Sequence, residues 1–327
     1  MIPPHIVDAI EQNGDAEQKA QAKRAKLIGQ TIRTSRALLG GLPLLSGGNH
    51  RAVFDAGRNE QPWDDRIRRE EDQPVTGDAD VDRAYDGLGN TIFTYQGAFG
   101  RNGIDGRGMG LNAYVHYGES LDNAYWDGSR MVFGDGDGRI FNSFTLPIDV
   151  VAHELTHGVT QFTANLVYQY QSGALNEHIS DVFGIMVKQR TLGIASRDAN
   201  WLIGEGLLAP GINGRGLREM LNPGTAYDDG LLGKDPQPAH MNNYIKTTQD
   251  NGGVHLNSGL MNRVFALACN AVAGNSWDTI GPVWYRVLSG GKLRSSATFR
   301  EFVCLALDEA GDYRGAIEDS AKVVGIL

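Results

Sequence analysis

The chain has 327 residues, of which 41% are hydrophobic, and its formal net charge is −9. This length allows about two domains with a substantial core, and the acidic balance excludes the basic surface typical of a nucleic-acid-binding protein. No apolar run approaches the ~18 residues of a membrane span, so we expect neither nucleic acid nor membrane as a partner.

The first 48 residues differ from the rest of the chain in composition. We expect an extended Pro-Pro start, then a polar helix in AEQKAQAKRAKLIGQTIRT at residues 16–34, then the Gly- and Pro-rich connection LLGGLPLLSGGN at residues 38–49. The first 36 residues contain no continuous apolar stretch of a secretory signal, so synthesis in the cytoplasm is expected. On composition alone this segment is either a removable pro-region or a disordered tail.

Residues 50–147 are rich in Gly, Asp, Asn and aromatic side chains, and the runs GLNAYVHYG and RMVFGDG predict short strands. From about residue 148 the apolar residues recur with a helical period, which predicts a largely helical second half. Its helices are expected within residues 147–165, 173–190, 257–272, 279–288 and 298–309. The two cysteines, Cys269 and Cys304, lie in apolar segments and are interpreted as buried free thiols, with one disulfide as the alternative.

A metal-binding pattern occurs in the first of these helices, in VVAHELTHGVTQ. His153 and His157 are four residues apart, so a helix places both imidazoles on one face, about 6 Å apart, where they can share an ion. Glu154 follows the first histidine, and H-E-x-x-H is the signature of metalloproteases that use this glutamate as general base. The alternative is a chance occurrence in an unrelated helix.

The next predicted helix offers a third ligand, Glu177, and one turn further along it Asp181, which could orient a histidine through its second ring nitrogen. Two histidines and one glutamate leave an open position, as in catalytic rather than structural zinc sites. The alternative for both carboxylates is a solvated helix face. The neighbouring His178 is interpreted as a bystander.

Three long blocks together resemble a known family. VVAHELTHGVTQFTANLVYQYQSGALNEHISDVFG, DNAYWDGSRMVFGDGDG and TQDNGGVHLNSGLMNRVF look like the signature blocks of the thermolysin-like zinc metalloproteases. The resemblance covers the chain from about Asp55 to its C-terminus. The short N-terminal segment with IPPHI looks most like that of the protealysin-type branch, which favours a propeptide over a disordered tail.

The resemblance implies a mechanism in which zinc polarises the scissile carbonyl and Glu154 deprotonates the attacking water. His255 and Tyr168 match the family's donors to the oxyanion, and Asp250 matches the residue that orients this histidine. Tyr170, two residues beyond Tyr168, remains an alternative for the tyrosine.

The resemblance also implies how a peptide substrate binds. Asn123 and Ala124 match an edge segment that pairs with an extended peptide, and Arg218 matches an arginine that binds a substrate carbonyl. Five apolar residues match the pocket beyond the scissile bond and predict cleavage before Leu, Phe, Ile or Val, with simple core positions as the alternative. They are Phe141, Phe144, Val150, Leu207 and Leu217.

One departure concerns the family's pair of calcium ions. Asp149 and Glu205 match its carboxylates, but Lys188, Asn200 and Leu202 stand where the pattern has acids. A lysine ammonium can replace the charge of a cation, so we expect the double calcium site to be lost. A single weak calcium ion elsewhere remains open.

These observations predict a two-lobed α+β zinc endopeptidase made as a zymogen. The expected parts are a propeptide at residues 1–48, a strand-rich lobe at 49–162 that ends in the zinc-binding helix, and a helical lobe at 163–327. Its expected partners are protein or peptide substrates and its own propeptide, which is cut within residues 38–49. Leaderless export to the extracellular space is possible. Two alternatives are a zinc aminopeptidase and a binding protein with a vestigial site.

Overall fold

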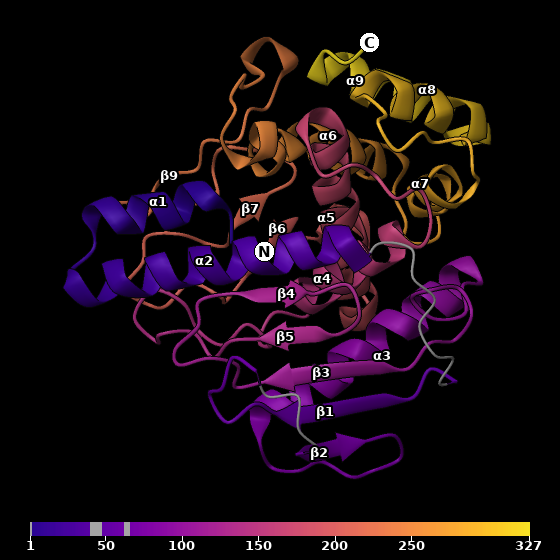
Figure 1. Ribbon diagram of the computed structural model, residues 1–327. Helices are drawn as coiled ribbons and strands as arrows, with labels where there is room; N and C mark the ends of the chain where they lie inside the picture. The colour runs from indigo at the N-terminus through magenta and orange to yellow at the C-terminus, as the bar shows by residue number, and fades with distance from the viewer. Residues whose placement is uncertain (1, 40–47, 62–65) are drawn as a thin grey trace.

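The computed structural model describes residues 2–39, 48–61 and 66–327 of the chain (Figure 1). It has the α+β architecture expected from the sequence, with a mixed five-stranded sheet in the order β2-β1-β3-β5-β4 and a helical second half. The strands of this sheet are β1 (Arg51–Asp55), β2 (Ile67–Glu70), β3 (Leu111–Val115), β4 (Ala124–Trp126) and β5 (Met131–Phe133).

The three central strands of this sheet are parallel, and each edge strand is antiparallel to its neighbour. β1 pairs in parallel with β3, and β3 with β5, whereas β2 and β4 are antiparallel to their neighbours. β4 is therefore the last strand at one side of the sheet, and this position matters for the site.

One face of the sheet packs on α3 (Ala79–Phe99), a 21-residue helix within the segment for which only strands were predicted. Its first amides are capped by the Asp78 side chain, and Gly100 ends it at φ +66, a left-handed conformation that glycine adopts without strain. Gly87 lets α3 approach the next helix closely, because a Cβ there would lie 2.9 Å from a methyl group of Val151.

The helical half surrounds a central pair, α4 (Ile148–Gln161) and α5 (Tyr170–Leu192), which were both predicted (Figure 1). The remaining helices are α6 (Asp250–Val272), α7 (Ile280–Ser289), α8 (Phe299–Glu309) and α9 (Arg314–Val324), of which only α9 was not expected. The segment between α5 and α6 carries two small hairpins, β6 (Leu202–Ile203) with β7 (Arg218–Glu219), and β8 (Asp228–Asp229) with β9 (Gly233–Lys234). Three short 3-10 helices complete the elements: η1 (Ser196–Asp198), η2 (Met241–Asn243) and η3 (Gly311–Tyr313).

The N-terminal segment forms a helical hairpin of α1 (Pro4–Asn13) and α2 (Ala16–Leu39). The predicted polar helix is present, but the expected extended Pro-Pro start is wrong after Pro3: Pro4 occupies the first helical position, where its missing N–H costs nothing. α2 lies beside β4, and α1 contacts α6, so the hairpin spans the two halves of the molecule (Figure 1). The predicted cleavage segment lies mostly in residues 40–47, outside the described residues.

Both cysteines are free thiols, as interpreted from the sequence. Cys269 is buried in α6, but the prediction that Cys304 is buried is wrong, because it lies on the exposed side of the amphipathic helix α8. The apolar residues around Cys304 in the sequence belong to the opposite, buried side of that helix.

Candidate metal centre and catalytic cleft

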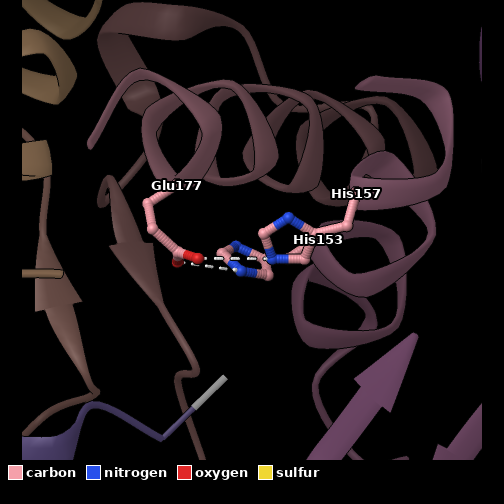
Figure 2. Close-up of side chains that lie close together, drawn as sticks. All are labelled: His153, His157 and Glu177. Carbon is pink, nitrogen blue, oxygen red and sulfur yellow. Dashed lines mark ion pairs between the residues drawn. The ribbon is translucent and has the colours of Figure 1, made fainter. Parts of the chain in front are cut away.

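The two histidines of the metal-binding pattern project from successive turns of α4, and Glu177 faces them from α5 (Figure 2). The helices approach closely at Gly184, where a Cβ would lie only 2.7 Å from the Asp149 carbonyl oxygen. All three ligands are nearly fully buried: no more than 3% of the surface of His153, His157 or Glu177 is exposed. The α4–α5 pairing thus brings together the three predicted ligands.

Their ligand atoms converge on one point. Nε2 of His153 lies 3.4 Å from Oε2 of Glu177, and Nε2 of His157 lies 3.4 Å from Oε1 (Figure 2). His153 Nε2 and Glu177 Oε2 are buried and have no hydrogen-bond partner among the residues that the structure describes. Buried polar atoms are costly without a partner, so this cluster fits a bound cation. Two imidazoles and one carboxylate are a donor set suited to zinc.

The second ring nitrogen of each histidine is occupied, which directs Nε2 toward the metal position. His153 Nδ1 lies 2.8 Å from Oδ1 of Asp181, and His157 Nδ1 lies 2.8 Å from Oδ1 of Asn176. Each acceptor keeps the ring proton on Nδ1 and leaves Nε2 free to bind metal. Asn176 was not identified from the sequence, although it immediately precedes Glu177 on the same helix.

Asp181 is held by four hydrogen bonds. Besides His153, it accepts two from Arg218, at 2.8 and 2.7 Å, and one from Asn262, at 2.8 Å. Burial alone would raise the pKa of Asp181, but the Arg218 and His153 groups outweigh it and hold that pKa far below its usual range. The carboxylate therefore stays ionised and fixes both the histidine and the arginine.

Glu154 points from α4 toward the sheet rather than toward α5. Its Oε2 accepts a hydrogen bond of 3.1 Å from the backbone amide of Trp126, the last residue of β4. The candidate base is therefore anchored to the edge strand of the sheet, a contact that the sequence did not indicate.

On the opposite side, His255 lies in the first turn of the regular part of α6 and is fixed by Asp250. Oδ2 of Asp250 accepts a hydrogen bond of 2.8 Å from the backbone amide of His255, and Oδ1 lies 2.6 Å from His255 Nδ1. His255 Nε2 then points to the cleft, 3.3 Å from the Tyr168 hydroxyl, which also hydrogen-bonds Glu177. Tyr170, the alternative, is 53% exposed, so the geometry places Tyr168 at the site.

The residues matched to substrate binding are all buried in the structure. Ala124 is the first residue of β4, and the Asn123 side chain accepts the backbone amide of Ile2 at 3.0 Å. The five apolar residues expected to form a pocket are buried in one hydrophobic cluster with Ile2 and Ile6 of the N-terminal segment. They are Phe141, Phe144, Val150, Leu207 and Leu217.

Among the residues matched to the family's calcium pair, which was expected to be lost, a lysine ammonium lies next to the carboxylates. Lys188 Nζ is 2.9 Å from Oε2 of Glu205, 3.1 Å from the Leu202 carbonyl oxygen and 4.0 Å from Oδ2 of Asp149. Asn200 donates to the same Glu205 oxygen at 2.8 Å. The lysine thus supplies a positive charge next to a fully buried aspartate.

Comparisons with known proteins agree with this geometry. Residues 49–161 match the family model described as "Thermolysin metallopeptidase, catalytic domain", and residues 164–325 match "Thermolysin metallopeptidase, alpha-helical domain". The chain is 50% identical to "Extracellular metalloprotease" of Pectobacterium carotovorum subsp. carotovorum, over 92% of this chain and 87% of the relative. It is 42% identical to "Protease PrtS" of Photorhabdus sp. (strain Az29), over 100% and 91% of the two chains.

Among solved structures, the chain is similar to "Precursor of Protealysin, Metalloproteinase from Serratia proteamaculans". The TM-score is 0.90 at 44% identity, and the match covers 100% of this chain and 99% of that one. Among the residues that the structure describes, no helix is both long and apolar enough to cross a membrane.

Proposed function

This chain belongs to the thermolysin family of zinc metallopeptidases, and from that premise we propose that it is an endopeptidase made as a zymogen, with residues 1–48 as propeptide. The observation that carries the proposal is the buried cluster of His153, His157 and Glu177, together with the bond from the N-terminal segment to Asn123 next to β4. The similarity to a precursor protein over the full chain supports the zymogen.

His153, His157 and Glu177 would hold the zinc ion. When bound there, zinc supplies a Lewis acid for the scissile carbonyl and lowers the pKa of a coordinated water. Glu154 is then the general base: the Trp126 amide holds its Oε2, so the carboxylate keeps one orientation beside the metal position.

Charge that develops on the carbonyl oxygen is stabilised by His255 and Tyr168. Because Asp250 binds the Nδ1 side of His255, the Nε2 side of the ring is turned toward Tyr168 and the proposed position of the oxyanion. The Tyr168 hydroxyl lies beside this nitrogen, and it exchanges its bond to Glu177 for one to the oxyanion.

We propose that an extended peptide adds to the outer side of β4, with Asn123 and Ala124 as its partners. Arg218 contributes to carbonyl binding while Asp181 keeps its guanidinium in place. The apolar side chains of Phe141, Phe144, Val150, Leu207 and Leu217 favour cleavage before Leu, Phe, Ile or Val.

In the zymogen the N-terminal segment occupies this region. Ile2 donates its amide to Asn123, and Ile2 and Ile6 share the hydrophobic cluster of the apolar residues named above. On α2, Arg24 pairs with Glu60 at 2.6 Å. The bond to Asn123 supports a segment that lies across the proposed substrate path, so cleavage beyond α2 would open that path.

Self-cleavage can be tested with Glu154→Gln, which keeps the three metal ligands but removes the base. The purified wild-type chain should shorten by about fifty residues on storage, whereas Glu154→Gln should stay full length and bind zinc equally well. Equal shortening of both purified proteins would exclude self-cleavage. Glu318→Gln, on α9 and paired with Lys322 of the same helix, is the matched control and should process like the wild type.

An N-terminally blocked peptide with an internal Leu separates this function from an aminopeptidase. The processed enzyme should cut the blocked peptide on the amino side of Leu, and a chelator should abolish the cut until zinc is restored. Cleavage of the same peptide only when its amino terminus is free would contradict the proposal and indicate an aminopeptidase. A protein that cuts neither the blocked nor the free peptide would instead be a binding protein.

Because relatives of this chain are named extracellular, we propose that it acts outside the cell.

A further inference from the structure

A chain of buried hydrogen bonds runs behind the metal centre through four helices. Trp284 on α7 donates its Nε1–H to Nε2 of His178 on α5 at 2.7 Å. His178 Nδ1 lies 2.9 Å from Oδ1 of Asn262 on α6, and Asn262 Nδ2 donates to Oδ2 of Asp181 at 2.8 Å. Asp181 binds the metal ligand His153 of α4.

The direction of every bond in this chain follows from its first member. An indole N–H can only donate, so His178 Nε2 must accept, and the proton of the neutral ring lies on Nδ1. The Asn262 oxygen must then accept from His178, which turns the amide nitrogen toward Asp181. A reversed amide would present its oxygen to the carboxylate and repel it.

All of these groups are inaccessible to water. Trp284, His178, Asn262 and Asp181 each have an exposed fraction of 0%. A group in this series of hydrogen bonds that lost its partner could not turn to solvent instead. Loss of the bond at one end therefore forces the neighbouring side chains to rearrange.

We propose that His178 and Trp284 are positioning residues for the zinc ligand His153, acting through Asn262 and Asp181. The inference rests on the proposed zinc site and concerns residues that touch neither zinc nor substrate. It gives His178 a role in place of the bystander interpretation from the sequence. Without the indole donor, the orientation of Asn262 is no longer fixed, and Asp181 holds the imidazole less rigidly.

The test measures how fast zinc leaves the full-length chain, in a Glu154→Gln background that prevents self-cleavage. An excess of a coloured chelator captures the released zinc. Trp284→Phe removes only the N–H and keeps an aromatic ring in the core. Loss of a group that is bonded directly to a metal-bound histidine commonly weakens metal binding by about 10- to 100-fold. Trp284 and His178 act less directly, so Trp284→Phe and His178→Leu should each speed zinc release about tenfold, the low end of this range.

Two variants separate positioning from general destabilisation. Trp201→Phe is the matched control, because Trp201 is also buried and donates its Nε1–H, at 3.1 Å to the Ser196 carbonyl, away from the metal ligands. It should lower the melting temperature comparably but leave zinc release unchanged. His178→Gln keeps one acceptor and one donor and should restore slow release. The double variant His178→Leu/Trp284→Phe should release zinc no faster than His178→Leu alone, because both changes interrupt the same series of hydrogen bonds.

The outcomes are distinguishable. Zinc release from Trp284→Phe at the rate of Trp201→Phe would overturn the inference while leaving the proposed zinc enzyme intact. Effects of the two single changes that multiply in the double variant would also overturn it. A parent chain that retains no zinc at all would refute the proposed function itself.

Discussion

The backbone amide of Ile2 donates a 3.0 Å hydrogen bond to Oδ1 of Asn123, the oxygen that also accepts the amide of Ala124. Both partners are buried, with 3% of Ile2 and 4% of Asn123 exposed. The chain's own N-terminal segment therefore occupies the side chain that we propose for substrate binding. Under that proposal, inhibition and substrate recognition use the same polar contact.

Loosening this segment should accelerate maturation. Ile6 is fully buried, and its replacement by alanine removes packing worth about 2–5 kcal/mol at a core position. We expect Ile6→Ala to shorten faster than the wild type and to show peptidase activity earlier, as followed by gel electrophoresis and cleavage of a blocked peptide. Leu27→Ala, on α2 and 66% exposed, is the control and should mature normally. Unchanged maturation of Ile6→Ala would show that α1 does not limit access to the cleft.

The two neighbouring tyrosines should differ in catalysis. Tyr168→Phe removes a hydroxyl near His255 and Glu177, whereas Tyr170→Phe removes one from an exposed side chain. Loss of one oxyanion donor commonly lowers kcat about 100-fold, so we expect that loss in kcat for Tyr168→Phe with KM little changed. Tyr170→Phe should retain nearly full activity. Equal kcat values for the two processed variants would remove Tyr168 from the mechanism.

Lys188 should make the Asp149 cluster independent of calcium. Its ammonium lies 2.9 Å from Glu205 and 4.0 Å from the fully buried Asp149. Removing the partner of a buried charge costs roughly 3 kcal/mol, so Lys188→Glu should melt at a clearly lower temperature. Added calcium should recover part of this loss but leave the wild-type melting temperature unchanged.

The exposed Lys234 provides the control for the charge reversal. Lys234→Glu should neither destabilise the protein strongly nor respond to calcium. If calcium stabilised the wild type as much as Lys188→Glu, the lysine would not be replacing the cation.

Stability should depend on pH through His116, which follows β3. A hydrogen bond to Asp135 at 2.7 Å, together with one to Asp78 at 3.1 Å, outweighs burial and raises the pKa of His116 to about 9. The ordinary pKa of histidine is about 6.5, so the stability from these ion pairs is fully present below pH 6.5 and is lost as the pH rises through about 9.

Melting temperatures of the wild type and His116→Asn between pH 6.5 and 9.5 measure this contribution. Asparagine tolerates the positive φ of 53° at this position. The difference between the two proteins should shrink as the pH rises. A constant difference would mean that the imidazole is neutral throughout.

Much of the metal centre could be predicted because its signal is local. The spacing of His153 and His157 determines a shared face on any helix, and the resemblance of three blocks supplied the partners from distant segments. Asn262, Trp284 and His178 could not be connected in the same way, since their contacts join residues 84 and 106 positions apart.

The missed helices have a different cause. α3 contains Gly87 and Gly89, which lower the helical signal, although Val81, Leu88 and Ile92 carry the period of a buried face. The glycine that obscured the helix is needed for its packing, because α3 approaches Val151 at that point. α1 is short and begins at a proline, and its burial depends on a cleft that lies more than a hundred residues away in the sequence.

The hairpin of α1 and α2 belongs to the same molecule as the cleft that it covers. While the backbone is intact, the cleft faces this segment at an effective concentration of the order of millimolar, however dilute the protein is. Once the connection is cut, the same contacts become a bimolecular equilibrium that depends on volume. In a confined compartment the released hairpin rebinds, whereas in open surroundings it diffuses away. For the proposed zymogen, dilution then determines when the cut enzyme becomes active.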